Sequence, residues 1–349
     1  MNNHIYTILL IAFVLLSCTE TSNNDKVTHR SKPLLADEIK FVDEIFEEQK
    51  ISLPEENTKE IGRIVDFSLD GFDNIYLLDN NSHIYKFNSR GEFIAKLNSI
   101  GRGPKEYAKV QKFCVNKDGL LFLDDWRQSR IQIYDTDFVH IGTLEKKTGG
   151  VLTDMLVDDR NNRLYCFDSH LENPVAIYDL KNNEFLKSVG FQDELVFRYS
   201  TRIKAGGMFL EGDELYYTLP NQYKIFSYNT QNEKESILAV SPSFHFKQVD
   251  EKIKSFRDSY NYSTVGSFYK VENYFFVRVM LPKESRLRDS DYSLLTDIIS
   301  AGGEKIKEGV FYKNIKRTPR TVSQNTLLSY DNIVTNEKNK TNIIILRYE

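Results

Sequence analysis

The stretch Ile64–Leu97, "IVDFSLDGFDNIYLLDNNSHIYKFNSRGEFIAKL", decides the fold because it contains four short apolar runs separated by polar turns. Val110–Leu144, "VQKFCVNKDGLLFLDDWRQSRIQIYDTDFVHIGTL", repeats the same order. The runs "HIYKFN" and "RIQIYD" alternate with the period of a β-strand. Each copy also carries a pair that is typical of a turn between antiparallel neighbours, Asp70-Gly71 and Asp118-Gly119. Each copy is therefore predicted to be a four-stranded antiparallel meander.

Weaker copies follow along the chain, and together they indicate a ring. They cover residues 151–189, 203–240 and 264 to about 300, and the final run "TNIIILRYE" looks like the last strand of a sixth copy. A period of roughly 40 to 50 residues is typical of β-propellers. Because an open row of meanders would expose strand edges at both ends, we expect the ring to close. The prediction is an all-β fold, a six-bladed β-propeller of four-stranded antiparallel blades.

Closure requires the two ends of the chain to pair. Gln49–Glu56, "QKISLPEE", offers a spare strand that we expect to complete the terminal blade beside the C-terminal strands. A single segment, "VDEKIKSFRDSY", has a helical pattern, with apolar residues spaced by four, three and four at Val249, Ile253, Phe256 and Tyr260. It predicts one short helical insertion, which is too little helix for a two-domain α/β alternative.

The N-terminus predicts a cellular address. Ile5–Leu16 is an apolar run too short to span a bilayer and typical of a signal peptide. "LLSC", which ends at Cys18, resembles the bacterial lipobox, although "MNNH" lacks the usual basic residue. The resemblance implies a signal peptide (1–17), a membrane anchor at lipidated Cys18, a polar tether (18–37) and a propeller domain (38–349). The alternative is a cysteine that merely ends a signal peptide.

Composition narrows the possible chemistry. Lys plus Arg number 46 and Asp plus Glu number 50, so no global positive field would attract nucleic acid. Cys114 and Cys166 lie in apolar runs and are expected to be small buried hydrophobic residues, with a disulfide as the alternative. The six histidines have no ligand spacing, and no nucleophile elbow or phosphate loop occurs, so we expect no metal or other cofactor.

The expected topology divides the loops between two rims. In an antiparallel blade, the loops that join the second strand to the third and the fourth to the next first strand must share one rim. The longer loops all fall there, including "GRGPKEYAK" (101–109), "DDWRQSR" (124–130), "DSHLENP" (168–174) and "PKESRLRDSDY" (282–292). Because binding residues concentrate on loops held by a rigid scaffold, we expect any ligand on this elaborated rim.

The loop Gly101–Tyr107, "GRGPKEY", together with the lipobox, resembles the six-bladed, NHL-like β-propeller lipoproteins of Bacteroidota. Their corresponding loop usually reads G-x-G-P-G-E-Y, and Lys105 stands here in place of its last glycine. The resemblance runs from about Ile61 onward and implies a propeller in the cell envelope, at the outer membrane and facing the periplasm or the surface, without a settled activity. We expect Gly101 and Gly103 to allow positive φ.

Seven rim residues are candidate ligand contacts: Arg102, Lys105, Glu106, Tyr107, Trp126, Arg127 and Arg130. Trp126 could stack on a sugar ring or a peptide. The alternative is that these side chains lock adjacent blades together. Our first hypothesis is an envelope-anchored binding module for a glycan, a peptide or an envelope protein. The alternatives are a carbohydrate-active hydrolase or lyase with carboxylates at the axial mouth, and a purely structural component.

Overall fold

The computed structural model of the chain describes residues 46–53, 60–148, 150–191, 205–238, 240, 243, 246–255, 258, 261–271, 273–282, 294–310, 320–323, 326–334 and 339–348. The predicted signal peptide, Cys18 and the predicted tether lie outside these residues. Residues 33–349 form one compact unit that contains all the described strands.

The described strands form six four-stranded sheets. From the centre outward, the first blade contains β2 (Ile64–Leu69), β3 (Ile75–Asp79), β4 (Ile84–Phe87) and β5 (Phe93–Leu97). The second contains β6 (Val110–Val115), β7 (Leu121–Asp125), β8 (Arg130–Tyr134) and β9 (His140–Glu145). The third contains β10 (Asp154–Asp158), β11 (Arg163–Phe167), β12 (Val175–Asp179) and β13 (Glu184–Val189).

The other blades follow the same plan. The fourth contains β14 (Gly207–Glu211), β15 (Glu214–Thr218), β16 (Ile225–Asn229) and β17 (Glu235–Leu238). The fifth contains β18 (Thr264–Val271), β19 (Tyr274–Met280), β20 (Leu294–Ser300) and β21 (Lys305–Val310), so it extends past the predicted end near Ser300. The sixth contains β22 (Arg320–Ser323), β23 (Thr326–Val334), β24 (Asn339–Tyr348) and β1 (Phe46–Ser52).

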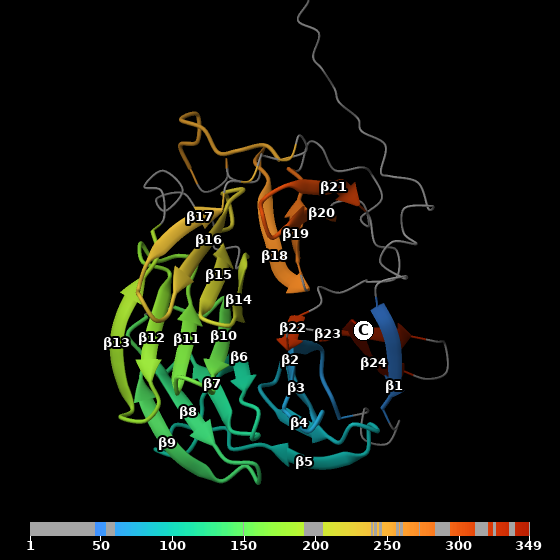
Figure 1. Cartoon of the computed structure of the whole chain (residues 1–349). Helices are drawn as coiled ribbons and strands as arrows, with labels where there is room; N and C mark the ends of the chain where they lie inside the picture. Colours follow the sequence, from blue (N-terminus) through green and yellow to red (C-terminus); the bar gives the residue numbers. More distant parts are fainter. Residues whose placement is uncertain are drawn as a thin grey trace, which may run out of the picture. The chain divides into compact units, whose positions relative to one another are not determined.

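The ring closes, as predicted. The innermost strands β2, β6, β10, β14, β18 and β22 contact one another in turn, and β22 also contacts β2 (Figure 1). β1 pairs antiparallel with β24, with Phe46 opposite Tyr348 and Ile51 opposite Ile343. The N-terminal strand is therefore the outer strand of the blade that ends the chain, which confirms the prediction made from Gln49–Glu56 for the part that is described.

The hydrophobic core is divided among the interfaces between blades. β3 and β7 are buried at every position, whereas the outer strand β9 alternates between partly exposed and exposed residues until Leu144. One apolar cluster joins Ile51 and Ile343 of the sixth blade to Ile75 and Phe87 of the first. Further clusters join the first blade to the second, the second to the third, the third to the fourth and the fourth to the fifth. β3 and β7 are buried on both faces because a neighbouring blade covers each face.

The short turns on the rim opposite the elaborated one, here called the smooth rim, are fixed by Asp and Asn side chains. Asp70 Oδ1 accepts the amide hydrogens of Phe72 and Asn74, and Asn116 Oδ1 accepts those of Asp118 and Leu120. Asp135 and Asp179 do the same after the third strands. Such side chains mimic a backbone turn and so end each strand at a defined residue.

The two Asp-Gly pairs that suggested the repeat are not equivalent in the structure. Asp70 corresponds to Asn116, because each caps its own turn. The left-handed position falls three residues later, at Asp73 with φ 60° and at Gly119 with φ 89°. Gly71 instead donates to Lys117 O of the next blade, where an added Cβ would lie 2.6 Å from that oxygen. The prediction of a meander is correct, although Asp118-Gly119 lies two residues further along its turn than Asp70-Gly71 does.

The helix predicted for Val249–Tyr260 is wrong for the described part of that segment. Asp250 Oδ1 accepts the Lys252 amide hydrogen, and Asp258 Oδ2 accepts that of Lys254, so side chains replace helical bonds. The segment contains turns, with Asp258 in a 3₁₀ turn, and Phe256 and Tyr260 lie outside the described residues. In the described ranges we find no helix with the length and apolarity needed to cross a bilayer.

The two internal cysteines, Cys114 and Cys166, are buried and free. Both belong to the apolar cluster between the second and third blades, beside Leu164 and Tyr178. Burial raises the pKa of the Cys166 thiol well above its ordinary value. The prediction that they act as small hydrophobic residues is confirmed, and the disulfide alternative is wrong in this structure.

Ile51→Ala should weaken ring closure. The Ile51 side chain is 6% exposed and belongs to the cluster that joins the first and sixth blades. Removing such a side chain costs about 2–5 kcal/mol of unfolding free energy. Lys50→Ala, on the exposed face of the same strand, should cost less than about 0.5 kcal/mol. Urea unfolding of both variants would contradict the closure model if the two losses were equal.

Candidate functional site

The loop Gly101–Tyr107 joins β5 to β6 on the elaborated rim and is closed by its own backbone. The Gly101 amide donates to Tyr107 O, and the Tyr107 amide donates to Ser99 O, each at 3.0 Å. Ile100 and Tyr107 form an isolated parallel bridge. The loop therefore leaves the first blade and enters the second through a narrow neck, with Arg102, Pro104, Lys105 and Glu106 exposed at its tip.

Glu106 explains the two glycines of this loop. Its carboxylate accepts the Gly103 amide hydrogen at 2.7 Å. A Cβ on Gly101 would lie 1.9 Å from Glu106 Oε2, and a Cβ on Gly103 would lie 3.0 Å from the same atom. Neither glycine has a φ in the left-handed region. The expectation of positive φ is thus wrong, and a Cβ at either glycine would instead meet the Glu106 carboxylate.

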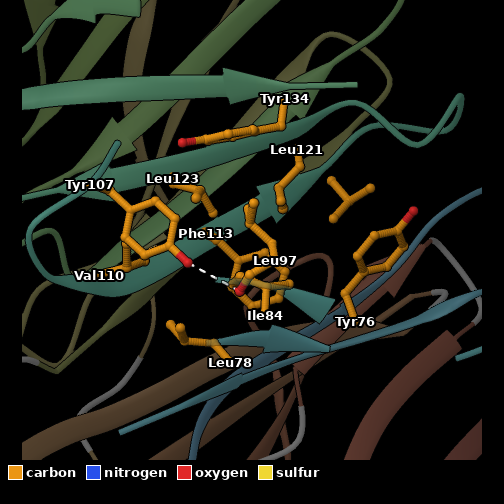
Figure 2. Packing of buried hydrophobic residues seen from close by; sticks show 11 residues of the cluster. Tyr76, Leu78, Ile84, Leu97, Tyr107, Val110, Phe113, Leu121, Leu123 and Tyr134 are labelled. Atoms are coloured by element: carbon orange, nitrogen blue, oxygen red, sulfur yellow. Dashed lines mark hydrogen bonds between the residues drawn. The ribbon is translucent and has the colours of Figure 1, made fainter. Parts of the chain in front are cut away.

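Tyr107 belongs to the interface between blades. Its side chain is fully buried, and its hydroxyl donates to Leu97 O at 3.1 Å (Figure 2). Its ring packs edge-on against Tyr134, with centroids 6.3 Å apart. Burial, with Tyr134 nearby, raises the pKa of Tyr107 far above its ordinary value. Tyr107 is therefore not available to a ligand in this structure, in agreement with the packing alternative.

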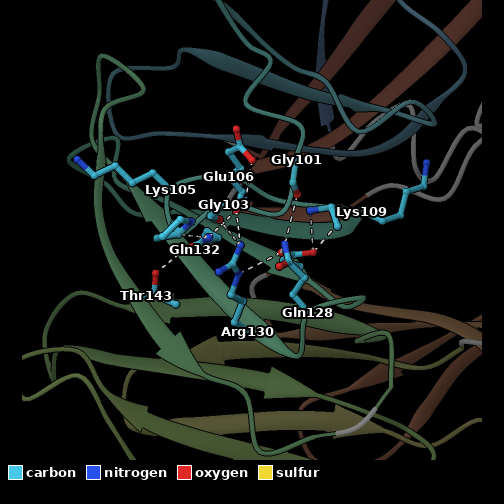
Figure 3. A network of polar contacts seen from close by, with 12 residues as sticks. Gly101, Gly103, Lys105, Glu106, Lys109, Gln128, Arg130, Gln132 and Thr143 are labelled. Carbon is cyan, nitrogen blue, oxygen red and sulfur yellow. Dashed lines mark hydrogen bonds and ion pairs between the residues drawn. The ribbon is translucent and has the colours of Figure 1, made fainter.

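Arg130 also serves the scaffold, because it holds the loop from below. Its Nη2 donates to Gly103 O at 2.9 Å and to Glu106 O at 2.6 Å, while its Nε pairs with Asp125 Oδ2 at 3.2 Å (Figure 3). Gln132 Nε2 donates to Glu106 O at 2.6 Å. These contacts fix the carbonyl groups of the loop and leave its charged tip facing solvent.

Asp125 connects this loop to the turn after β7. Its Oδ1 accepts the amide hydrogens of Ala108 and Lys109, and its Oδ2 accepts from Gln128 and Arg130. Gln128 Nε2 lies 3.4 Å from Gly101 O. The two loops, residues 99–109 and 124–130, therefore form one rigid polar surface over the second blade.

The same device recurs on the elaborated rim. Asp79 at the end of β3 accepts the Gly62 amide hydrogen of the incoming connection. Asp124 accepts the Leu152 amide hydrogen and pairs with Lys146 at 2.6 Å, and both charged side chains are fully buried. Asp79 and Asp125 end the second strands of the first and second blades. Each caps its own turn and also accepts from a neighbouring connection.

The candidates that remain at the surface are mainly basic. Arg102, Lys105 and Arg127 are exposed, and Trp126 is partly buried. The Arg127 guanidinium lies over the Trp126 ring at 5.5 Å from its centroid. Trp126 Nε1 is buried and has no hydrogen-bond partner among the described residues. Arg102, Lys105, Glu106 and Arg127 are thus the exposed residues of the predicted site, and Trp126 is partly buried. Tyr107 and Arg130 support the loop.

His140 lies close enough to Lys105 for the lysine charge to affect its pKa. Burial is the main cause that lowers the pKa of His140, and the positive charges of Lys105 and Arg130 lower it further. His140 Nε2 donates to Gln132 Oε1, 2.9 Å away, and the His140 ring packs edge-on against Tyr134. The positive potential around Lys105 therefore extends to the outer strand of the second blade.

Two carboxylates of the innermost strands, Asp66 and Asp154, make contacts between blades. Asp66 Oδ1 pairs with Lys112 at 3.3 Å, and its Oδ2 accepts the Phe113 amide hydrogen. Asp154 Oδ2 accepts the Met208 amide hydrogen. Burial raises the pKa of Asp297, which lies on β20, the third strand from the centre. The described residues also contain no group of His, Cys, Asp and Glu that could hold a metal ion.

Comparisons with known proteins agree with this architecture. A family model described as a 6-bladed beta-propeller matches residues 20–146. The chain is a six-bladed β-propeller. Its structure is similar to that of a candidate exported protein of Bacteroides fragilis, with a TM-score of 0.62 at 15% identity over 88% of this chain and 96% of that one.

Two further structures have the same fold at low identity. A member of the duf4221 family from Bacteroides vulgatus has a TM-score of 0.58 at 12% identity. The match covers 87% of the chain described here and 99% of the Bacteroides vulgatus chain. The structure of U3-55K has a TM-score of 0.53 at 11% identity, over 84% and 98%. No protein of curated function matches the sequence. At these identities the likeness concerns the fold alone.

Gly101→Ala should act through Glu106. The new methyl group must displace the carboxylate from the Gly103 amide hydrogen, which should cost about 1 kcal/mol, the order of one hydrogen bond. Glu106→Ala removes the same contact, so the double variant should be no less stable than Glu106→Ala alone. Gly142→Ala is the control, since its Cβ would meet nothing closer than 3.6 Å. Additive losses in urea unfolding would contradict the mechanism.

Asp297→Asn should reduce the pH dependence of stability. Burial raises the pKa of Asp297 above 3.8, outweighing the hydrogen bonds from Tyr223, Gly309 and Ser243, and Glu308 adds to the rise. The folded protein thus binds this proton more tightly than the unfolded chain does, so wild-type stability should fall as pH rises above 3.8. The Asn variant should lack that decrease.

Asp250→Asn provides a control of opposite sign for the Asp297 experiment. A hydrogen bond from Tyr262 is the main cause that lowers the pKa of Asp250, so its contribution should be lost as pH falls below 3.8. Thermal unfolding of the three proteins from pH 3 to pH 7 measures both slopes. The assignment fails if Asp297→Asn follows the wild-type curve.

Proposed function

We propose that this propeller is a lipid-anchored binding module of the cell envelope, attached through Cys18, whose elaborated rim binds a glycan, a peptide or an envelope protein. The observation that carries the proposal is the difference between the two rims. On the smooth rim, short Asx-capped turns such as 70–74 and 116–120 leave little beyond the strand ends. On the elaborated rim, the Gly101–Tyr107 loop is held rigidly and presents charged side chains to solvent.

β1 begins and β24 ends at the smooth rim. β1 leads into the connection to β2, which lies on the elaborated rim, so its first residue, Phe46, lies at the smooth rim. Tyr348 pairs with Phe46 at the same end.

Export is supported by likeness and by the N-terminal sequence. The similar structure from Bacteroides fragilis is described as that of a candidate exported protein. In this chain the apolar run Ile5–Leu16 followed by "LLSC" supports export and lipidation. One acyl chain alone gives only marginal attachment, so the anchor would require the several chains that the lipobox resemblance implies.

A hydrolase or lyase receives less support from the described residues. A glycosidase needs two carboxylates that face the scissile bond, one of them usually with a raised pKa. Asp66 and Asp154 of the innermost strands are instead bound to neighbouring blades. Asp297, whose pKa is raised, is 1% exposed and is bound to Tyr223 and Gly309. A binding role therefore fits these residues better than catalysis.

Site-directed masking tests which rim binds. In a Cys18→Ala background, Ser129→Cys places a thiol on the elaborated rim and Ser89→Cys places one on the smooth rim, both at exposed residues. Cys114 and Cys166 are buried and should not react with a maleimide polymer. We expect saturable binding to a glycan array, a peptide library or solubilised envelope proteins, and its loss only when residue 129 carries the polymer.

Two results would overturn the proposal. The binding role fails if no member of the three panels binds saturably, or if masking residue 89 blocks binding as strongly as masking residue 129. The anchor is tested separately by cell fractionation, where Cys18→Ala should move the protein from the membrane fraction to the soluble fraction. An unchanged membrane fraction would show that Cys18 is not the attachment point.

A further inference from the structure

Three exposed cations on the elaborated rim, Arg102, Lys105 and Arg127, define what we call the basic rim patch. Among the described residues none forms an ion pair with any of the three. The chain as a whole carries a formal charge of −4. A local excess of unpaired cations on an acidic protein indicates a site for an anionic ligand, because exposed charges are otherwise interspersed with opposite ones.

The acidic residues beside the patch are already occupied. Glu106 accepts the Gly103 amide hydrogen, and Asp125 accepts from Ala108, Lys109, Gln128 and Arg130. The positive charges of Lys105 and Arg130 add to burial in lowering the pKa of His140, which agrees with a positive potential there. The nearby carboxylates thus bind the loop rather than the cations of the patch.

The patch is preorganised by hydrogen bonds to the loop carbonyls. Gly101 O accepts from Gln128, Gly103 O accepts from Arg130, and Lys105 O accepts from the Tyr134 hydroxyl at 2.9 Å. These three carbonyls lie beside Arg102 or belong to Lys105 itself. Figure 3 shows Lys105 projecting outward from this network. A ligand would therefore meet cations on a fixed backbone, which lowers the ordering cost of binding.

The backbone of the loop offers little to a peptide. The amide hydrogens of Gly101, Gly103, Glu106, Tyr107, Ala108 and Lys109 all have acceptors within the protein. Peptides that add to a protein surface commonly use main-chain bonds for affinity. Nucleic acid requires a longer basic track, because affinity grows with the number of phosphates neutralised. Recognition here is left to side chains, namely three cations and one aromatic ring.

Trp126 adds the aromatic ring to the basic rim patch. It follows β7 directly, and the Arg127 guanidinium lies 5.5 Å from its ring centroid. An amphipathic ring beside cations suits a sugar that carries a carboxylate, since the ring can contact the sugar face while a guanidinium binds the acid group. We infer that the basic rim patch binds an acidic polysaccharide through its carboxylate groups. This inference rests on the proposed binding function and names its ligand class.

Polygalacturonate is the probe, and its methyl ester is the uncharged control of the same sugar. Trp126 is the only tryptophan of the chain, so its fluorescence reports on this site alone. Titration with polygalacturonate should change the emission saturably, and the methyl ester should not. Binding should weaken between 0.05 M and 0.5 M salt, because the screening length shrinks from about 14 Å to about 4 Å.

Charge-matched variants locate the binding. Arg102→Ala/Lys105→Ala/Arg127→Ala should bind polygalacturonate about tenfold more weakly or worse, the order expected for losing three exposed ion pairs. Arg90→Ala/Lys181→Ala/Lys234→Ala removes the same charge from exposed residues of the smooth rim and should bind like wild type. Urea unfolding checks that both triple variants are folded.

The patch can also be tested without a polymer. Iodide should quench Trp126 more efficiently than caesium does, and this difference should shrink in the elaborated-rim variant only. The inference is overturned if the methyl ester binds equally well, if the smooth-rim variant loses as much affinity, or if polyglutamate or single-stranded DNA binds as tightly as polygalacturonate. If the protein binds a neutral ligand instead, and a polymer on residue 129 blocks that binding, this inference is contradicted and the proposed function is supported.

Discussion

The structure depends on one constraint, which is that each blade is apolar on both faces and can bury them only against its neighbours. β3 and β7 are buried at every position, although each lies in the middle of a single-layer sheet. The described apolar clusters each draw residues from two blades. A single blade in water would expose both faces, so burial favours the closed ring over any part of it. β1 completes the sixth blade, because it pairs with β24 and its Ile51 packs in the apolar cluster shared with the first blade.

A second constraint follows from the antiparallel order, since every connection must lie on one of two rims. On the smooth rim an Asx side chain caps its own turn. On the elaborated rim one aspartate accepts hydrogen bonds from two loops. Asp79 Oδ1 accepts from its own turn, and its Oδ2 accepts from Gly62 of the incoming connection. In Asp125, Oδ2 accepts from its own turn and Oδ1 from the incoming connection. The scaffold thereby fixes the position of long loops that could not fix themselves.

The repeat could be predicted from the sequence because strand burial leaves a periodic pattern, but contacts between distant residues could not. Ring closure followed from edge protection, and β1 follows it in the structure. The helix expected at Val249 failed because Asp250 and Asp258 supply local acceptors that compete with helical bonds, a choice that apolar spacing does not record. The role of Arg130 was also not readable, since its partners Gly103 and Glu106 lie more than twenty positions away in the chain.

The same distinction separates the supporting residues of the rim from its exposed ones. Gly101 and Glu106 are coupled sterically, because the carboxylate lies where a side chain on residue 101 would begin. Tyr107 and Arg130 are coupled to the blades through Leu97 O and Asp125. Arg102 and Lys105 have no such ties, so they can be replaced without disturbing a described contact between blades. In a propeller built in this way, the loop-tip side chains can change while the aspartates and the tyrosine that hold the loops stay as they are.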